Sequence, residues 1–248
     1  MKFFLHLSYK GTQYHGWQRQ AQVPTVQQAL ETAIEKMLGY RVHCVGCGRT
    51  DAGVHASNYY CHIVVDEPFS FDPVFRLNRM LPPDISIFDC VEVPWQAHAQ
   101  KDALARTYTY HIHTRKEALL NELSAFYPAE GLEVEKLRAV AALLPHHRDY
   151  TAMCLQSDEN KTKICEVSEA FWTASEDGHR LQFQITANRF LRGMVRILVG
   201  SMLEVGYGRS PVEAFEQALR SGEPLPGARS AYPQGLYLSG VKYPYLGL

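Results

Sequence analysis

Residues 2–10 read KFFLHLSYK, and this stretch begins the pattern that decides the fold. Successive side chains of a β-strand point to opposite sides, so Phe3, Leu5, Leu7 and Tyr9 share one face. The opposite face is mostly polar. We therefore predict a strand with one buried face at the start of the chain.

A helix is predicted after this strand, because apolar residues recur at helical spacing over residues 26–38. Thr25 and Gln28 have the spacing of a capping box, which would stabilise the start of this helix. Asp72 followed by Pro73 predicts a second helix, since proline at the first helical position loses no needed hydrogen bond. The first half then has the split β-α-β-β-α-β order: a strand at 2–10, a helix at 26–38, strands near 42–46 and 58–65, a helix from 72 to before Pro82, and a strand at 85–93.

The second half of the chain repeats this order. Its longest predicted element is a helix from about Arg189 to Val205, with Asn188 placed to cap it. The dipeptide Asp177-Gly178 predicts a hairpin turn. The expected elements are a strand around 106–112, a helix at 133–144, hairpin strands at 163–173 and 180–187, the long helix, a helix from Ser210 to Gly222, and a strand at 235–243.

Two such units predict an α+β protein. We expect them to share a broad, mostly antiparallel mixed sheet with helices packed on it, and a cleft where the halves meet. The crossing near residues 95–104 is short and has no low-complexity linker. We therefore divide the chain into an N-terminal half, 1–100, and a C-terminal half, 101–248.

Composition excludes several classes of protein. Hydrophobic residues make up 46% and charged residues 21% of the 248-residue chain, which excludes wholesale disorder. No apolar run is long enough to predict a membrane span, and the first residues lack the pattern of a signal peptide, so the expected location is the cytoplasm. The net charge is 25 − 26 = −1, but residues 180–209 and 101–116 are locally basic, as in a protein with a groove for a polyanion or in an ordinary solvated surface.

Metal and disulfide chemistry are not predicted. Six cysteines spread over a chain of this length do not suggest a disulfide framework. Cys44 and Cys47 form one Cys-x-x-Cys pair without a second pair at zinc spacing. His111 and His113 would share a strand face, but no third ligand is in view, and we expect them to be structural.

The densest candidate site is the glycine-rich loop from Gly46 to His55. It fails as a dinucleotide motif because Asp51 occupies the third glycine position and strands flank the loop on both sides. Asp51 is then a lone carboxylate on a tight loop. Such a residue is either a turn former or a nucleophile presented by a rigid sheet.

Two further features could serve an anion or a nucleic acid. Arg189, Arg192 and Arg196 would line one face of the predicted long helix, where like charges repel unless they meet anions or reach solvent. Tyr108 and Tyr110 would share one face of a strand with basic residues around them. Tyrosine beside arginine suits base stacking with phosphate binding, although tyrosine is also common in strand cores.

At this point a family resemblance is apparent. The motif GRTDAGVHA at residues 48–56 resembles the signature of the tRNA pseudouridine synthase A (TruA) family. Further similar segments follow in the family order over nearly the whole chain, at 11–20, 105–110, 194–196, 199–202 and 235–238. The nine-residue loop motif is highly specific, whereas the others would be weak alone.

The resemblance implies a pseudouridine synthase fold and an isomerase that converts uridine to pseudouridine in the anticodon stem-loop of tRNA, at positions 38–40. It implies no metal and no organic cofactor, and a homodimer that binds tRNA across both subunits. Asp51 would be the catalytic nucleophile, Tyr108 would contact the target uracil, and Arg196 would pair with Asp51. Arg49 would assist extrusion of the target nucleotide. Further candidates for RNA phosphate contacts are Arg189, Arg192, Arg106 and Arg19.

Some residues depart from the family pattern. Gln100 and Lys101 stand where an arginine and an aromatic residue are expected, Lys10 replaces an aspartate, and Tyr150 and Met153 replace phenylalanines. None of these departures removes Asp51, Tyr108 or Arg196, but the preferred uridine could differ. Two functions from other classes stay open. One is a non-catalytic RNA-binding protein on the same scaffold, and the other is an Asp51-dependent nucleoside hydrolase that releases free uracil.

Overall fold

The computed structural model describes residues 1–155 and 162–246, and the chain forms two compact units. Unit 1 comprises residues 1–104 and the segment from Tyr237 onward. Unit 2 comprises residues 105–236. The last strand thus packs with the first part of the chain. The division into functional halves at residue 100 stays a prediction.

Unit 1 contains a sheet in the order β4 (Ile85–Glu92), β1 (Lys2–Tyr9), β3 (His55–Val64) and β9 (Leu236–Lys242), with the short β2 (Val45–Gly46) on β3. The first three strands are antiparallel, and β9 runs parallel to β3. In β1 the residues at positions 3, 5, 7 and 9 are buried, as predicted, and Phe4 is buried too. The predicted strand at 42–46 is reduced to β2.

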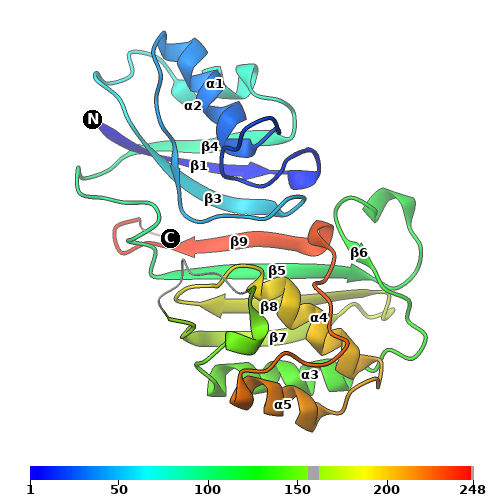
Figure 1. Ribbon diagram of the computed structural model, residues 1–248. Helices are drawn as coiled ribbons and strands as arrows, with labels where there is room; N and C mark the ends of the chain where they lie inside the picture. Colours follow the sequence, from blue (N-terminus) through cyan, green and yellow to red (C-terminus); the bar gives the residue numbers. More distant parts are fainter. Residues whose placement is uncertain (156–161, 247–248) are drawn as a thin grey trace. The chain divides into compact units, whose positions relative to one another are not determined.

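Two helices pack together beside these strands, α1 (Val26–Leu38) and α2 (Pro73–Met80) (Figure 1). The predicted cap of α1 is present, since the amide of Gln28 donates to Thr25 Oγ1, and Asp72 caps α2 by accepting from the amide of Phe75. α1 buries the apolar stripe that includes Leu30 and Ile34. Local sequence therefore accounts for both helices.

Unit 2 is built on an antiparallel group of strands, β5 (Ala105–His113), β8 (Arg180–Ala187) and β7 (Val167–Ala174). The short β6 (Ala125–Phe126) pairs parallel with β5. Three helices, α3 (Val134–Leu143), α4 (Met194–Gly206) and α5 (Val212–Ser221), contact one another, and α3 packs against β7 (Figure 1). The fold class predicted from sequence, α+β with mostly antiparallel mixed strand pairing, is confirmed.

The predicted long helix from Arg189 is wrong at its start. α4 begins at Met194, after Gly193 at φ 70°, and Asn188 accepts a hydrogen bond from the amide of Glu166 instead of capping a helix. The carbonyl of Arg192 accepts from the amide of Leu155, and the Leu155 side chain packs against Gly193. These tertiary contacts override the apolar periodicity that suggested a continuous helix.

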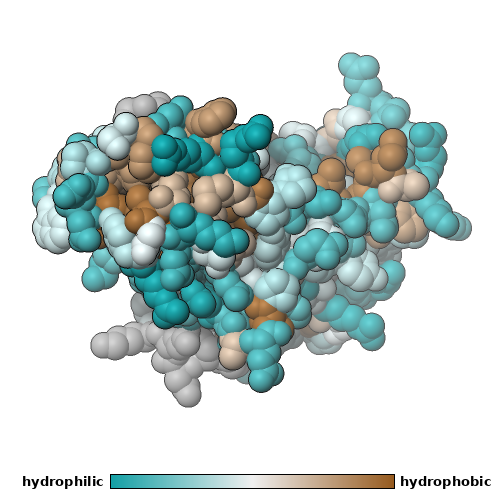
Figure 2. Space-filling view, turned by 90° about the horizontal axis from the view of Figure 1, so that it is seen from above, coloured by the Kyte–Doolittle hydropathy of each residue, from teal (hydrophilic) through white to brown (hydrophobic). Residues whose placement is uncertain are grey.

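The face of the molecule in Figure 2 is mostly hydrophilic, with apolar side chains in separate small areas. Among the described helices none is long and apolar enough to span a bilayer.

Candidate active site

The Asp51 loop joins β2 to β3 in unit 1. Its turn is closed by a hydrogen bond from the Val54 amide to the Asp51 carbonyl (3.2 Å). The side chain of Asp51 is half-buried, its neighbour Thr50 is buried, and Arg49 is exposed. The loop therefore has the Asp51 carboxylate and the Arg49 guanidinium at its surface, and the buried Thr50 between them.

A buried aromatic group supports the first part of this loop. The Trp17 and Tyr59 rings stack with centroids 4.3 Å apart, and the Tyr59 hydroxyl donates to the Gly48 carbonyl (2.5 Å). The Tyr9 hydroxyl is hydrogen bonded to Thr50 Oγ1 (2.9 Å). Burial raises the pKa of Tyr59, so its hydroxyl stays protonated as a donor. Rigid rings and specific hydrogen bonds thus fix Gly48 and Thr50, which lie three residues and one residue before Asp51.

The segment at 11–17 wraps around the same loop. The amide of Trp17 donates to the Thr50 carbonyl (3.3 Å), and the amide of Gly53 donates to the Tyr14 carbonyl (3.2 Å). Gly16 has φ +83°, and a Cβ at this position would press on the backbone of Thr50. A glycine is needed here for both reasons. The loop motif and the motif at 11–20 are therefore two sides of one structure.

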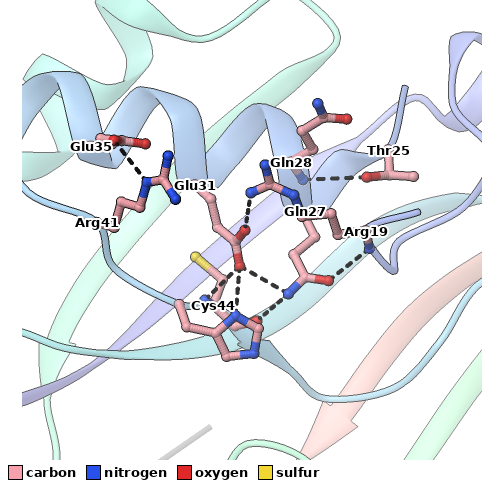
Figure 3. Close-up of polar contacts among 9 residues, drawn as sticks. Arg19, Thr25, Gln27, Gln28, Glu31, Glu35, Arg41 and Cys44 are labelled. Carbon is pink, nitrogen blue, oxygen red and sulfur yellow. Dashed lines mark hydrogen bonds and ion pairs between the residues drawn. The ribbon is translucent and has the colours of Figure 1, made fainter. Parts of the chain in front are cut away.

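A carboxylate network anchors α1 to the chain just before β2 (Figure 3). Buried Glu31 accepts hydrogen bonds from Gln27 (2.9 Å), from the Cys44 amide (3.1 Å) and from Arg19 (2.9 Å), and its Oε1 lies 2.9 Å from His43 Nδ1. Gln27 also donates to the Cys44 carbonyl. Sequence reasoning missed this role, because Glu31 resembles an ordinary helix surface acid. Arg19, a candidate phosphate contact, is paired with Glu31, although its side chain is 57% exposed.

Tyr108 lies on β5 of unit 2 and is 8% exposed. Its ring meets that of Phe190 edge-to-face, with centroids 4.9 Å apart. Arg106, two residues earlier on the same strand, donates to the Asn188 carbonyl (3.4 Å). The start of β5 and the chain before α4 therefore lie together, with tyrosine and arginine side chains on them.

Arg196 is in the first turn of α4 and is half-buried. Its Nε donates to the Ala231 carbonyl (2.7 Å), and the Ala231 amide donates back to the Arg196 carbonyl (2.9 Å). The guanidinium is thus oriented by a backbone group. A guanidinium held in this way is suited to bind a carboxylate or phosphate in a fixed geometry.

The basic stretch of unit 2 is less uniform than its sequence suggests. Arg192 is exposed and Arg189 half-buried, but both precede α4, so the predicted three-arginine stripe on one helix does not exist. Arg180 is paired with Glu117 (3.0 Å) and Arg209 with Glu204 (2.8 Å).

Metal and thiol chemistry find no support in the described part of the chain. No group of three or more metal-ligating side chains occurs there. All six cysteines are free, and five are buried. Burial raises the pKa of the Cys90 thiol to about 12 and that of Cys165 to about 11, which makes them poor nucleophiles. Asp51 is the candidate nucleophile of unit 1, and Tyr108 and Arg196 are candidate site residues of unit 2.

An α+β scaffold that presents one carboxylate on a braced loop fits the pseudouridine synthase class of enzymes. The family model described as tRNA pseudouridine synthase matches residues 140–244. The protein called tRNA pseudouridine synthase A from Porphyromonas gingivalis is 38% identical over 246 residues, which cover 98% of this chain and 97% of that one. Proteins of the same name from Bacteroides fragilis and Caldicellulosiruptor bescii are 39% and 35% identical, over 98% and 96% of this chain and 96% and 98% of theirs. The chain belongs to the tRNA pseudouridine synthase A family.

Proposed function

We propose that this protein is an isomerase that converts uridine to pseudouridine in tRNA. Relatives named for this activity align over nearly the whole chain, and the observation that carries the proposal is the loop that presents Asp51. Its support from the segment at 11–17 gives the rigidity that a catalytic carboxylate needs. The substrate in this proposal is uridine at positions 38–40 of the anticodon stem-loop. The enzyme acts in the cytoplasm as a homodimer, without metal or organic cofactor.

The reaction breaks the bond between ribose C1′ and uracil N1 and forms one between C1′ and C5. The C5 proton is lost and N1 gains one, so the atomic composition and mass of the RNA are unchanged. The target uridine must first leave its stack, which Arg49 would assist as an exposed side chain beside Asp51. Asp51 then attacks C1′, attacks uracil C6, or acts as a base toward a glycal intermediate.

The partners of Asp51 in this proposal come from unit 2. Arg196 pairs with the Asp51 carboxylate, keeping it ionised and oriented. Tyr108 contacts the detached uracil while it rotates, which prevents its escape. The braced guanidinium of Arg196 and the position of Tyr108 at the start of β5 support these roles.

The decisive experiment uses Asp51→Asn with Asp66→Asn as a matched control, because Asp66 is an exposed aspartate of the same unit. The Asp51 variant should fold normally and form no pseudouridine, since an amide retains the turn but cannot act as a nucleophile. The measurement is mass spectrometry of tRNA with carbodiimide mapping. Unchanged RNA mass with a new carbodiimide-reactive site indicates isomerisation. Release of uracil would instead establish the hydrolase, and RNA binding without either product would establish the non-catalytic protein.

Phosphate contacts by Arg189, Arg192, Arg106 and Arg19 are tested by salt dependence. Each neutralised phosphate contributes roughly −0.9 for a duplex, or −0.7 for a single strand, to the slope of log K against log salt. Arg192→Ala should weaken tRNA binding and reduce that slope by about one unit. The control is Arg41→Ala, since Arg41 is an exposed arginine of unit 1 paired with Glu35. Equal slopes for the two variants would remove Arg192 from the RNA interface.

A further inference from the structure

Two tyrosine hydroxyls hold the backbone of residue 232. The Tyr110 hydroxyl donates to the Tyr232 carbonyl (2.8 Å), and the Tyr232 amide donates to the Tyr127 hydroxyl (3.3 Å). Tyr110 and Tyr127 thus satisfy both polar backbone groups of Tyr232.

The residue before Tyr232 in this segment, Ala231, is the partner of Arg196. Ala231 accepts from Arg196 Nε (2.7 Å) and donates to the Arg196 carbonyl (2.9 Å). Both polar backbone groups of Ala231 and of Tyr232 are therefore used. We call Ala231 and Tyr232 the clamp. Tyr110 and Tyr127 hold the clamp at Tyr232, and the clamp holds Arg196 at Ala231.

Two glycines allow this segment to lie so close to its neighbours. A Cβ on Gly200 of α4 would overlap the Arg229 carbonyl, and a Cβ on Gly235 would lie 2.7 Å from the Tyr110 ring. The backbone of residues 229–235 therefore lies close to α4 at Gly200 and close to the Tyr110 ring at Gly235. Such packing leaves little freedom for the Ala231 carbonyl.

The tyrosines themselves are fixed as donors and acceptors. Tyr110 is fully buried on β5, and Tyr127 follows β6 directly, where its amide donates to the His113 carbonyl. The short β6, which pairs with β5, thus delivers Tyr127 to the clamp. Burial raises the pKa of both hydroxyls, so they stay protonated over the working range of the enzyme.

We propose that Tyr110 and Tyr127 are positioning residues that fix the guanidinium of Arg196 through the backbone of Ala231 and Tyr232. This inference rests on the proposed function, in which Arg196 orients the catalytic carboxylate. Loss of either hydroxyl loosens the Ala231 carbonyl and lets the Arg196 guanidinium turn. A misplacement of the guanidinium by about 1 Å lowers the rate of the chemical step by about tenfold to 100-fold.

The test compares Tyr127→Phe and Tyr110→Phe with Tyr150→Phe. Tyr150 is a matched control, because it is a fully buried tyrosine of unit 2 whose hydroxyl donates to the Leu144 carbonyl (2.7 Å), away from the clamp. The clamp variants should lower kcat for pseudouridine formation by about tenfold or more, with KM for tRNA within about twofold of wild type. Tyr150→Phe should leave kcat unchanged. Equal kcat values for the clamp variants and the control, at matched melting temperatures, would overturn the inference.

A double-mutant cycle separates positioning from general stability. In an Arg196→Lys background, Tyr127→Phe should lower kcat no further, because the group it positions is already gone. A full additional loss in that background would show that Tyr127 acts by another route and would refute the proposal.

A second measurement does not depend on activity. The Arg196 Nε–H signal in ¹⁵N NMR should be protected from exchange in the wild type and lose that protection in Tyr127→Phe and Tyr110→Phe but not in Tyr150→Phe. Unchanged protection in both clamp variants would overturn the positioning role. If the wild type shows this pattern yet forms no pseudouridine, the proposed function fails while the clamp stands.

Discussion

Replacing Gly16 by alanine should disable the enzyme without unfolding it. Gly16 has φ +83°, and its Cβ would lie well inside contact distance of the Thr50 carbonyl oxygen and 3.2 Å from the carbonyl carbons of Thr50 and Asp51. The neighbours are backbone, so the loop must yield by about 1 Å, a misplacement that can cost ~10²-fold in rate. The left-handed backbone alone costs about 1–2 kcal/mol for alanine.

Gly39→Ala provides the matched control for this prediction. Gly39 ends α1 at φ +82° and has nothing within 4 Å of the added Cβ, so alanine there carries the same backbone strain without the collision. Gly39→Ala should lose about 1–2 kcal/mol of unfolding free energy, or roughly 2–8 °C in Tm for a chain of this size, and Gly16→Ala should lose at least as much because it also has the collision. Only Gly16→Ala should lose kcat, by about 100-fold.

The assay is single-turnover pseudouridine formation on saturating tRNA, with Tm from calorimetry on the same samples. If Gly16→Ala and Gly39→Ala have the same kcat, the segment at 11–17 does not position Asp51, and the supporting argument is wrong. If only Gly39→Ala loses activity, the collision at Gly16 does not affect catalysis, and the prediction is wrong.

Three further changes test other parts of unit 1. Glu31→Gln should cost about 2–3 kcal/mol by breaking the charge-assisted hydrogen bonds of the Arg19 network, measured by urea unfolding, and an unchanged midpoint would contradict this. Burial lowers the pKa of His62 from 6.5 to about 4, so the unfolded state binds the proton first and stability falls as pH drops from about 6.5 to 4, by at most about 3 kcal/mol. His62→Gln should flatten that pH dependence, and an unaltered slope would reject it. Asp72→Ala should lower the unfolding free energy by about 1 kcal/mol through loss of the α2 cap, and an unchanged Tm would contradict this.

Local patterns predicted most elements because each depends on neighbouring residues. α1, α2 and the β7–β8 hairpin follow from spacing, caps and turn residues in one stretch of chain. The start of α4 could not be predicted, because Leu155, far away in sequence, captures the carbonyl of Arg192 and packs on Gly193. Apolar periodicity indicates the preference of an isolated segment for a helix, whereas contacts with residues distant in sequence set the boundary of that helix.

The candidate site divides in the same way. The composition of the loop at 46–55 singled out Asp51, since a lone carboxylate among glycines is visible in sequence. Its supports are not visible, because Gly16 and Tyr59 reach it from other elements. The role of Tyr127 could not be predicted from sequence, since a tyrosine after a two-residue strand looks like a surface residue. Its role depends on the hydrogen bond from the Tyr232 amide, 105 residues away in sequence.

The departures from the family pattern are compatible with an intact scaffold. At 97–102 the chain is held by backbone groups, since the Ala99 amide donates to His62 Nδ1 and the Ala99 carbonyl accepts from the Tyr243 hydroxyl (2.5 Å). Gln100 and Lys101 are exposed on that fixed backbone, so their substitution changes the surface of the protein and leaves its core unchanged. At Tyr150 the added hydroxyl is satisfied by the Leu144 carbonyl. A buried polar atom is costly only when it has no partner, so the core can accept this change.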